Sequence, residues 1–182
     1  MNKTNEQFDT VIADCRRIYV LKMKDYGPSW RIMRPQTVND QLFIKAKRIR
    51  EIEITGVTLV DESIDDALMA IVNYSVIGLI QLRQGFADGV YMTRERAVEL
   101  YDDYVHEAKE LMLRKNHDYG EAWRDMLPSS LTDIILTKIN RNKSIAANDN
   151  QTLISEGVEG NYFDMLNYAV FYLIKLSEAT QQ

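Results

Sequence analysis

Apolar residues recur along most of this 182-residue chain at intervals of three and four, and strict alternation is scarce. This spacing is typical of amphipathic helices rather than of strands. It predicts six helices, over about residues 5–24, 37–53, 63–84, 94–116, 131–147 and 162–178. A break rich in β-branched residues at 55–61 is too short to form a sheet. The predicted fold class is therefore all-α.

The third and sixth of these helices are apolar almost all round, and each contains an Asn-Tyr pair, Asn73-Tyr74 and Asn167-Tyr168. Helices of this kind belong at the centre of a bundle. Gly27 and Gly120 follow the first and fourth helices, where a residue with positive φ commonly ends a helix. Each half of the chain thus has the same plan of three helices.

One segment is present twice. The pattern Lys-x-x-Asp-Tyr-Gly-x-x-Trp-Arg-x-Met-x-Pro covers residues 22–35 and returns at 115–128, and 11 of the 27 pairs between 22–48 and 115–141 are identical. This is a tandem duplication. We expect two fused three-helix repeats, 1–89 and 90–182, that share one core as a pseudo-twofold bundle, like a symmetric dimer that has been joined. Whether this fused pseudo-dimer forms a further homodimer stays open.

Composition narrows the class of partner. The net charge of −5 and pI near 5.1 give no strong nucleic-acid signal, because a broad nucleic-acid-binding face carries a basic excess. The single cysteine, Cys15, suits a reducing compartment. The N-terminus has no apolar signal core, and the longest apolar run, 68–82, is shorter than the roughly 20 residues of a membrane span. These features predict a cytoplasmic protein without a membrane partner.

Carboxylates gather before and within the two central helices. They are Glu62, Asp65 and Asp66 in the first half and Glu156, Glu159 and Asp164 in the second. Asp164 and Asn167 share a helix face, and Asp164 lies among apolar neighbours, where an acid needs a partner or a cation. Oxygen-rich clusters suit Mg²⁺. The alternative is that acids in a first helical turn only complement the helix dipole.

Basic residues repeat on the second and fifth helices, where Lys45 and Arg48 correspond to Lys138 and Arg141. They are candidates for binding phosphates, since Arg makes bidentate contacts and Lys supplies a point charge. A solvated face, or ion pairs with the carboxylates, would explain the same pattern.

The repeated tryptophans, Trp30 and Trp123, have two interpretations. They could stack on a nucleobase, or they could anchor the loop that carries them onto the bundle. The sequence contains neither a Gly-rich phosphate loop nor a nucleophile elbow, so it lends no support to P-loop or α/β-hydrolase chemistry.

The series Lys-x-x-Asp-Tyr-Gly-x-x-Trp, Lys-x-x-Arg and Asp-x-x-Asn-Tyr resembles the nucleotide modification associated domain 1 family, in two copies at about 8–84 and 101–178. That family looks related to the MazG-like and dimeric dUTPase all-α nucleoside triphosphate pyrophosphohydrolases. The relationship implies a helical bundle, Mg²⁺ held by carboxylates, and hydrolysis of a nucleotide between its α- and β-phosphates. This chain departs from the enzymes by lacking Glu-Glu-x-x-Glu and by having Ala70 in place of the first-half aspartate.

The resulting hypothesis is an Mg²⁺-dependent pyrophosphohydrolase that acts on a nucleotide, with modified or unusual deoxynucleotides among the candidate substrates. The expected catalytic residues are Asp164, Glu159 and Asn167. The expected metal ligands are Asp164, Glu156, Glu159, Glu62, Asp65 and Asp66. The expected substrate-binding residues are Lys45, Arg48, Lys138, Arg141, Trp30, Trp123 and Asn73. Because only the second copy keeps the aspartate, we expect one composite site weighted toward the C-terminal half. The alternatives are a non-catalytic module that senses a nucleotide or contacts another protein, and a purely structural helical protein.

Overall fold

The computed structural model describes residues 3–153 and 156–181, which form six α-helices and two short 3-10 helices and contain no strand. The elements are α1 (Lys3–Tyr26), η1 (Ser29–Ile32), α2 (Pro35–Thr55), α3 (Ile64–Gln84), α4 (Arg94–Tyr119), η2 (Ala122–Asp125), α5 (Pro128–Ala147) and α6 (Val158–Ala179). The all-α fold and the plan of three helices in each half are confirmed.

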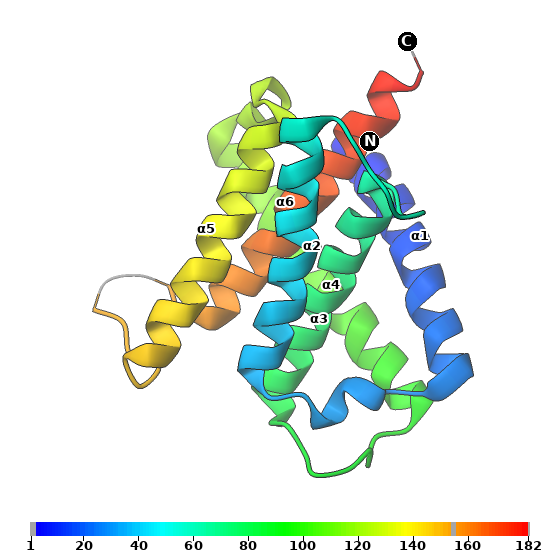
Figure 1. Ribbon diagram of the computed structural model, residues 1–182, viewed down its shortest axis with the longest axis vertical. Helices are drawn as coiled ribbons and strands as arrows, with labels where there is room; N and C mark the ends of the chain where they lie inside the picture. The colour runs from blue at the N-terminus through cyan, green and yellow to red at the C-terminus, as the bar shows by residue number, and fades with distance from the viewer. Residues whose placement is uncertain (1–2, 154–155, 182) are drawn as a thin grey trace.

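The helices pack as three pairs, each of which joins the two halves of the chain. The pair α2 and α5 lies in front of α3 and α6 in Figure 1, and α1 and α4 contact each other and the same central pair. Most of α3 and α6 is buried, as expected from their apolar composition. One hydrophobic core therefore runs through both repeats.

The outer pair α1 and α4 shows the twofold relation of the repeats most directly. Arg16 on α1 bonds Asp102 on α4 at 2.7 Å, and Lys109 on α4 bonds Asp9 on α1 at 2.6 Å. Arg16 and Lys109 are equivalent positions, as are Asp9 and Asp102, with an offset of 93. Reciprocal contacts of this kind define the interface of a twofold dimer. The two repeats therefore contact each other as two identical subunits would.

The paired asparagines of the central helices have equivalent backbone contacts. The Asn73 amide donates to the Cys15 carbonyl at 3.1 Å, and the Asn167 amide donates to the Ala108 carbonyl at the same distance. Both asparagines are buried, so each bond ties a central helix to the first helix of its own half. These asparagines thus have a structural role as well as a place beside the pockets described below.

Helix ends follow local sequence signals, with two corrections. Gly27 and Gly120 have φ of 68° and 60°, as expected. The helices α2 and α5 begin earlier than predicted, at their prolines, because proline is favoured in the first turn, where its missing N–H costs nothing. Thr37 is therefore inside α2 and does not cap it. The helix α6 begins at Val158, since Gly160 lies in its first turn and does not interrupt it.

The helix α3 is, within the described ranges, the one helix long and apolar enough by composition to cross a membrane. In the window that meets this test, 61% of the helix is buried inside the bundle. Packing against α6 and α2 accounts for its apolar composition.

Candidate functional site

Two pockets occupy equivalent positions in the two repeats. The first has a cavity volume of about 360 Å³ and is lined by residues between Ile18 and Ile77. The second, of about 320 Å³, is lined by residues between Met112 and Phe171. The equivalent positions that carry the same residue in both pockets are Lys22/Lys115, Tyr26/Tyr119, Trp30/Trp123, Met33/Met126, Asn73/Asn167 and Tyr74/Tyr168. Each of these pockets is lined by residues of one half, whereas the sequence predicted one composite site.

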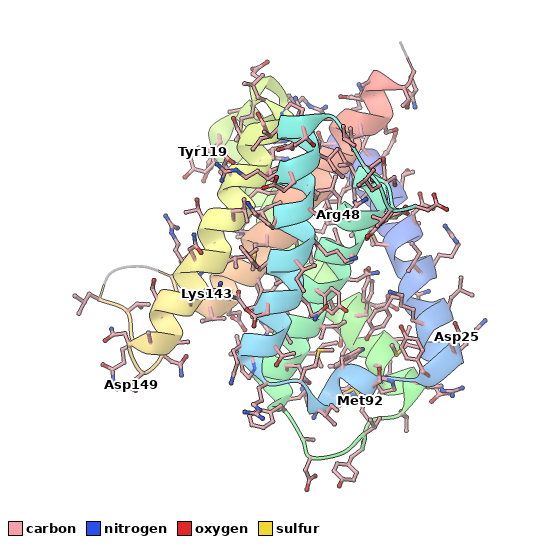
Figure 2. All side chains as sticks on the ribbon, in the orientation of Figure 1. Asp25, Arg48, Met92, Tyr119, Lys143 and Asp149 are labelled. Carbon is pink, nitrogen blue, oxygen red and sulfur yellow. The ribbon has the colours of Figure 1, made fainter. Side chains whose placement is uncertain are left out.

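The exposed tyrosines that line the two pockets lie on opposite sides of the bundle (Figure 2). The repeated Asp-Tyr-Gly turns contribute Tyr26 to the first pocket and Tyr119 to the second. In Figure 2 Asp25, beside Tyr26, is at the lower right and Tyr119 is at the upper left. Both tyrosines are more than half exposed, whereas Tyr74 and Tyr168 are half-buried. Each pocket therefore has aromatic side chains both at its rim and along its wall.

The tryptophans form the inner walls of these pockets. Trp30 is 4% exposed and packs against Tyr19, with ring centroids 6.5 Å apart. Trp123 is 5% exposed and stacks on Phe171 at 4.3 Å, and the Arg124 guanidinium lies 4.4 Å from the Trp123 ring centroid. Neither indole N–H has a hydrogen-bond partner among the described residues. The tryptophans thus anchor the loop, and at the same time they line the cavity.

Gln81 on α3 holds the wall of the first pocket in place. Its buried amide nitrogen lies within 3.0 Å of the carbonyl oxygens of Trp30, Arg31 and Met33. Its side-chain oxygen accepts from the buried Arg31 guanidinium. In the second half Lys175 takes this position and donates to the Arg124 carbonyl at 2.5 Å. One side chain of the central helix therefore positions each short 3-10 helix.

Asp164 lies between two lysines in the second half. Its Oδ1 accepts from Lys115 and its Oδ2 from Lys138, both at 2.7 Å. The carboxylate is 9% exposed, Lys138 is 14% exposed and Lys115 is 40% exposed. Burial lowers the pKa of Lys115, but the hydrogen bond to Asp164 and its charge outweigh burial and raise that pKa overall. Asp164 thus neutralises the basic mouth of its own pocket.

The first pocket has no such bridge, because Ala70 takes the place of Asp164. Lys45 bonds Glu62 at 2.6 Å, and Arg48 donates to the Glu62 carbonyl and to the Thr58 hydroxyl. Figure 2 shows Arg48 on α2 beside the loop that leads to α3. Lys45, which lines the pocket, is therefore held by a carboxylate, and Arg48, which is not among the lining residues, is held by the loop.

A third, more open cavity of about 830 Å³ adjoins the second pocket and shares Lys115 and Asp164 with it. It brings together Lys138, Arg141, Glu156 and Asp164, four of the residues predicted from the sequence. The remaining second-half acid, Glu159, lies elsewhere and bonds Arg83 at 2.6 Å.

The predicted carboxylates do not form a metal-binding cluster. Within 3–153 and 156–181, no three His, Cys, Asp or Glu side chains are grouped as metal ligands. Asp66 closes a capping box with Ser63 at the start of α3, and Asp65 is exposed in the same turn. Two ammonium groups on the Asp164 carboxylate also oppose a divalent cation there. The described donors do not fit a resident Mg²⁺.

Three features of the site were missed by sequence reasoning: Lys22, Lys115 and Gln81. The lysines open the repeated Lys-x-x-Asp-Tyr-Gly motif, so the repeat itself carried their signal. Gln81 had none, because its repeat partner is Lys175 and only the fold shows that each bonds the short 3-10 segment of its own half.

Replacing Asp164 by asparagine should destabilise the protein by about 2 kcal/mol, less than the full cost of breaking a buried ion pair because Lys115 is partly exposed. Urea denaturation at neutral pH measures this difference. Because the pKa of Lys115 is raised, its contribution is full below the ordinary lysine value of 10.5 and is lost as the pH rises through the higher folded value. An unchanged midpoint would show that the two lysines do not depend on this carboxylate.

Comparison with known proteins gives one match. The family described as "Nucleotide modification associated domain 1" matches residues 22–82 and 115–176. No curated protein and no solved structure matches the chain. The predicted similarity to MazG-like enzymes is not supported by these comparisons. The two matched regions are the two structural repeats without most of α1 and α4, and together they cover more than half of the sequence. The chain belongs to the nucleotide modification associated domain 1 family, which it contains in two copies.

Proposed function

We propose that this protein binds nucleotides through its repeat-related pockets. The observation that carries the proposal is a cavity with aromatic walls and a lysine at its rim that occurs in both halves. Volumes of about 320 and 360 Å³ lie at the lower end of the range for small-ligand sites, roughly 300–1,000 Å³. The family's association with nucleotide modification supports the same class of ligand.

The chemistry of the walls suits the parts of a nucleotide. A base is planar and apolar on its faces, and it gains stacking energy against aromatic side chains such as Tyr26 and Tyr74. Lysine ammonium groups bind phosphate as point charges. In the second half the Asn167 carbonyl oxygen has no partner in the described part of the chain, which leaves an acceptor beside the cavity. Asn73 differs because the Tyr101 hydroxyl donates to it at 2.8 Å.

Hydrolysis of the nucleotide to release pyrophosphate is the second candidate. It is favoured by the open cavity that joins Asp164 and Glu156 with Lys138 and Arg141. These residues could orient a polyphosphate chain. The two basic side chains would bind its phosphate oxygens, and the two carboxylates would repel those oxygens from their own side of the cavity. Because the described acids do not fit a resident Mg²⁺, we place binding before catalysis.

Both candidates are tested with one panel of ribo- and deoxynucleotides. Purified protein should bind at least one class of nucleotide in isothermal titration calorimetry, and a nucleoside with the same base should bind more weakly. Pyrophosphate release is then measured with Mg²⁺ present. Release that is lost in Asp164→Asn would establish the pyrophosphohydrolase. Binding without release would leave a nucleotide-binding module, and the absence of binding to the whole panel would refute the proposed function.

A further inference from the structure

We infer that the first pocket binds an oxyanion between Lys22 and Lys45, in the place that the Asp164 carboxylate occupies in the second half. The inference rests on the proposed function for one point only, that the oxyanion is the phosphate of a nucleotide. It assigns the phosphate-binding site to the N-terminal repeat, whereas the sequence favoured the C-terminal one.

The second half shows how two lysines of this repeat bind one pair of acceptor oxygens. Lys115 and Lys138, on α4 and α5, converge on the two oxygens of one carboxylate at 2.7 Å each. A carboxylate and a phosphate present the same pair of acceptor oxygens to such a pair of donors. The backbone that carries these lysines belongs to the repeat, so the same geometry is available to Lys22 and Lys45 on α1 and α2.

The first half has the lysines without the carboxylate. Lys22, Lys45 and Ala70 all line the first pocket. Alanine at this position removes the carboxylate and leaves open space where the second half has Asp164. Lys22 has no hydrogen-bond or ion-pair partner among residues 3–153 and 156–181, and it is exposed at the rim. A ligand oxyanion would bridge Lys22 and Lys45 as the Asp164 carboxylate bridges Lys115 and Lys138 in the second half.

Glu62 does not replace the missing aspartate, although it bonds Lys45 at 2.6 Å. Its repeat counterpart is Glu156, which the second half has in addition to Asp164. Glu62 comes from the loop before α3 and is 27% exposed, whereas Asp164 is inside α6 and 9% exposed. The acid before the helix is thus common to both halves, whereas the acid inside the helix, Asp164, is present only in the second.

Asp66 also lines the first pocket, so the two halves do not differ in their number of acids near the lysines. The Asp66 carboxylate is already bonded at the start of α3, where it accepts from the Ser63 N–H at 2.9 Å. That bond and the Ser63 side chain hold its pKa below the ordinary value. The difference between the pockets is therefore the position of the carboxylate and not the net charge.

The remaining walls indicate what the oxyanion is attached to. Beyond the lysines the pocket is formed by Trp30, Tyr74, Met33 and Met69, which suit a flat, weakly polar body. A nucleoside monophosphate has such a body on one phosphate, and it fits a pocket with two lysines on one side and aromatic and methionine side chains on the other.

The test is Ala70→Asp, which gives the first half the carboxylate of the second. Calorimetry with deoxynucleoside 5′-monophosphates, the matching nucleosides and inorganic phosphate compares this variant with the wild-type protein. The introduced carboxylate should bridge Lys22 and Lys45, and monophosphate affinity should fall by about 10- to 100-fold. Ala70→Asn has nearly the same volume without the charge and should lose much less. Circular dichroism confirms that each variant folds.

Lys22→Met tests the same site without burying a new group and should weaken monophosphate binding by a similar factor. Lys47→Met is the matched control, because Lys47 lies two residues from Lys45 but pairs with Glu51 on the outer surface. It should leave the affinity unchanged. Ala70→Asp binding as tightly as wild type, or equal losses for Lys22→Met and Lys47→Met, would overturn the inference while nucleotide binding itself stands.

The titration with inorganic phosphate distinguishes this inference from the proposed function. Inorganic phosphate that binds the wild-type protein and not Ala70→Asp, with no nucleotide binding, would support the oxyanion site and refute nucleotides as its ligands. No binding of phosphate or of any monophosphate would refute both.

Discussion

Replacing Gly78 by alanine should destabilise the protein by about 1–3 kcal/mol, even though alanine is the better helix former. A Cβ atom at Gly78 would lie 2.5 Å from Cε1 of Tyr162, closer than real contacts allow. Tyr162 is 2% exposed and is packed on α6 against α3, so its ring has no free space to enter. The close approach of the two central helices therefore depends on glycine here. Urea denaturation measures the change in the free energy of unfolding.

Gly160→Ala is the matched control for Gly78→Ala. Its Cβ would lie 2.5 Å from a Glu156 carboxylate oxygen and 2.9 Å from the Glu156 Cβ, so Glu156 must shift. Glu156 is exposed and precedes α6, whereas Tyr162 is enclosed between two central helices, so this variant should lose clearly less stability than Gly78→Ala. The double variant Gly78→Ala/Tyr162→Leu should recover part of the loss, because leucine already stands at the repeat-equivalent position, Leu68. Equal effects of the two glycine variants would show that the close packing at Gly78 is unimportant.

Replacing Gln81 by leucine should cost roughly 2–4 kcal/mol and should loosen the segment that carries Trp30. The amide nitrogen of Gln81 lies within 3.0 Å of three carbonyl oxygens. Its side-chain oxygen accepts from Arg31, a residue that is only 8% exposed. Leucine would remove all of these bonds. The Trp30 and Arg31 carbonyls would keep the N–H groups of Met33 and Ala87, and Arg31 would keep the Gly85 carbonyl, so the loss falls most heavily on the Met33 carbonyl. Urea denaturation gives the loss of stability, and hydrogen exchange should show faster exchange over residues 29–33.

Lys175→Leu is the comparison for Gln81→Leu in the second half. Lys175 makes a single bond to the Arg124 carbonyl and is only partly buried, so its loss should be clearly smaller. Equal destabilisation of the two variants would show that the three carbonyl contacts of Gln81 contribute no more stability than the single contact of Lys175. Nucleotide binding at the first pocket should fall in Gln81→Leu and persist in Lys175→Leu.

Helix content, helix order and the central place of α3 and α6 were predictable because they depend on local periodicity and on composition. Thr93 and Ser63 cap their helices as short-range signals suggest. The prediction was wrong by two to four residues where the signals conflict, at Pro35, Pro128 and Gly160. In each case the helix continues through a residue that is permitted in a first turn.

The candidate site was only partly predictable. Lys138 and Asp164 were identified as candidates for different roles, and in the structure they bond each other. Charge pairing depends on which helices meet, and a pattern on one helix does not reveal the partner on another. Glu159 shows this most simply, because its partner Arg83 is 76 residues away.

The sequence by itself determined that this protein is helical, that it is duplicated, and that Ala70 in the first copy stands where the second copy has Asp164. These conclusions need only local spacing and comparison of one segment with another. The tertiary structure alone decided that each copy forms its own pocket, and that the aspartate closes one lysine pair while the alanine leaves the other open. The physical reason is that a lysine on α4 and another on α5 reach one carboxylate on α6 only after the three helices have packed.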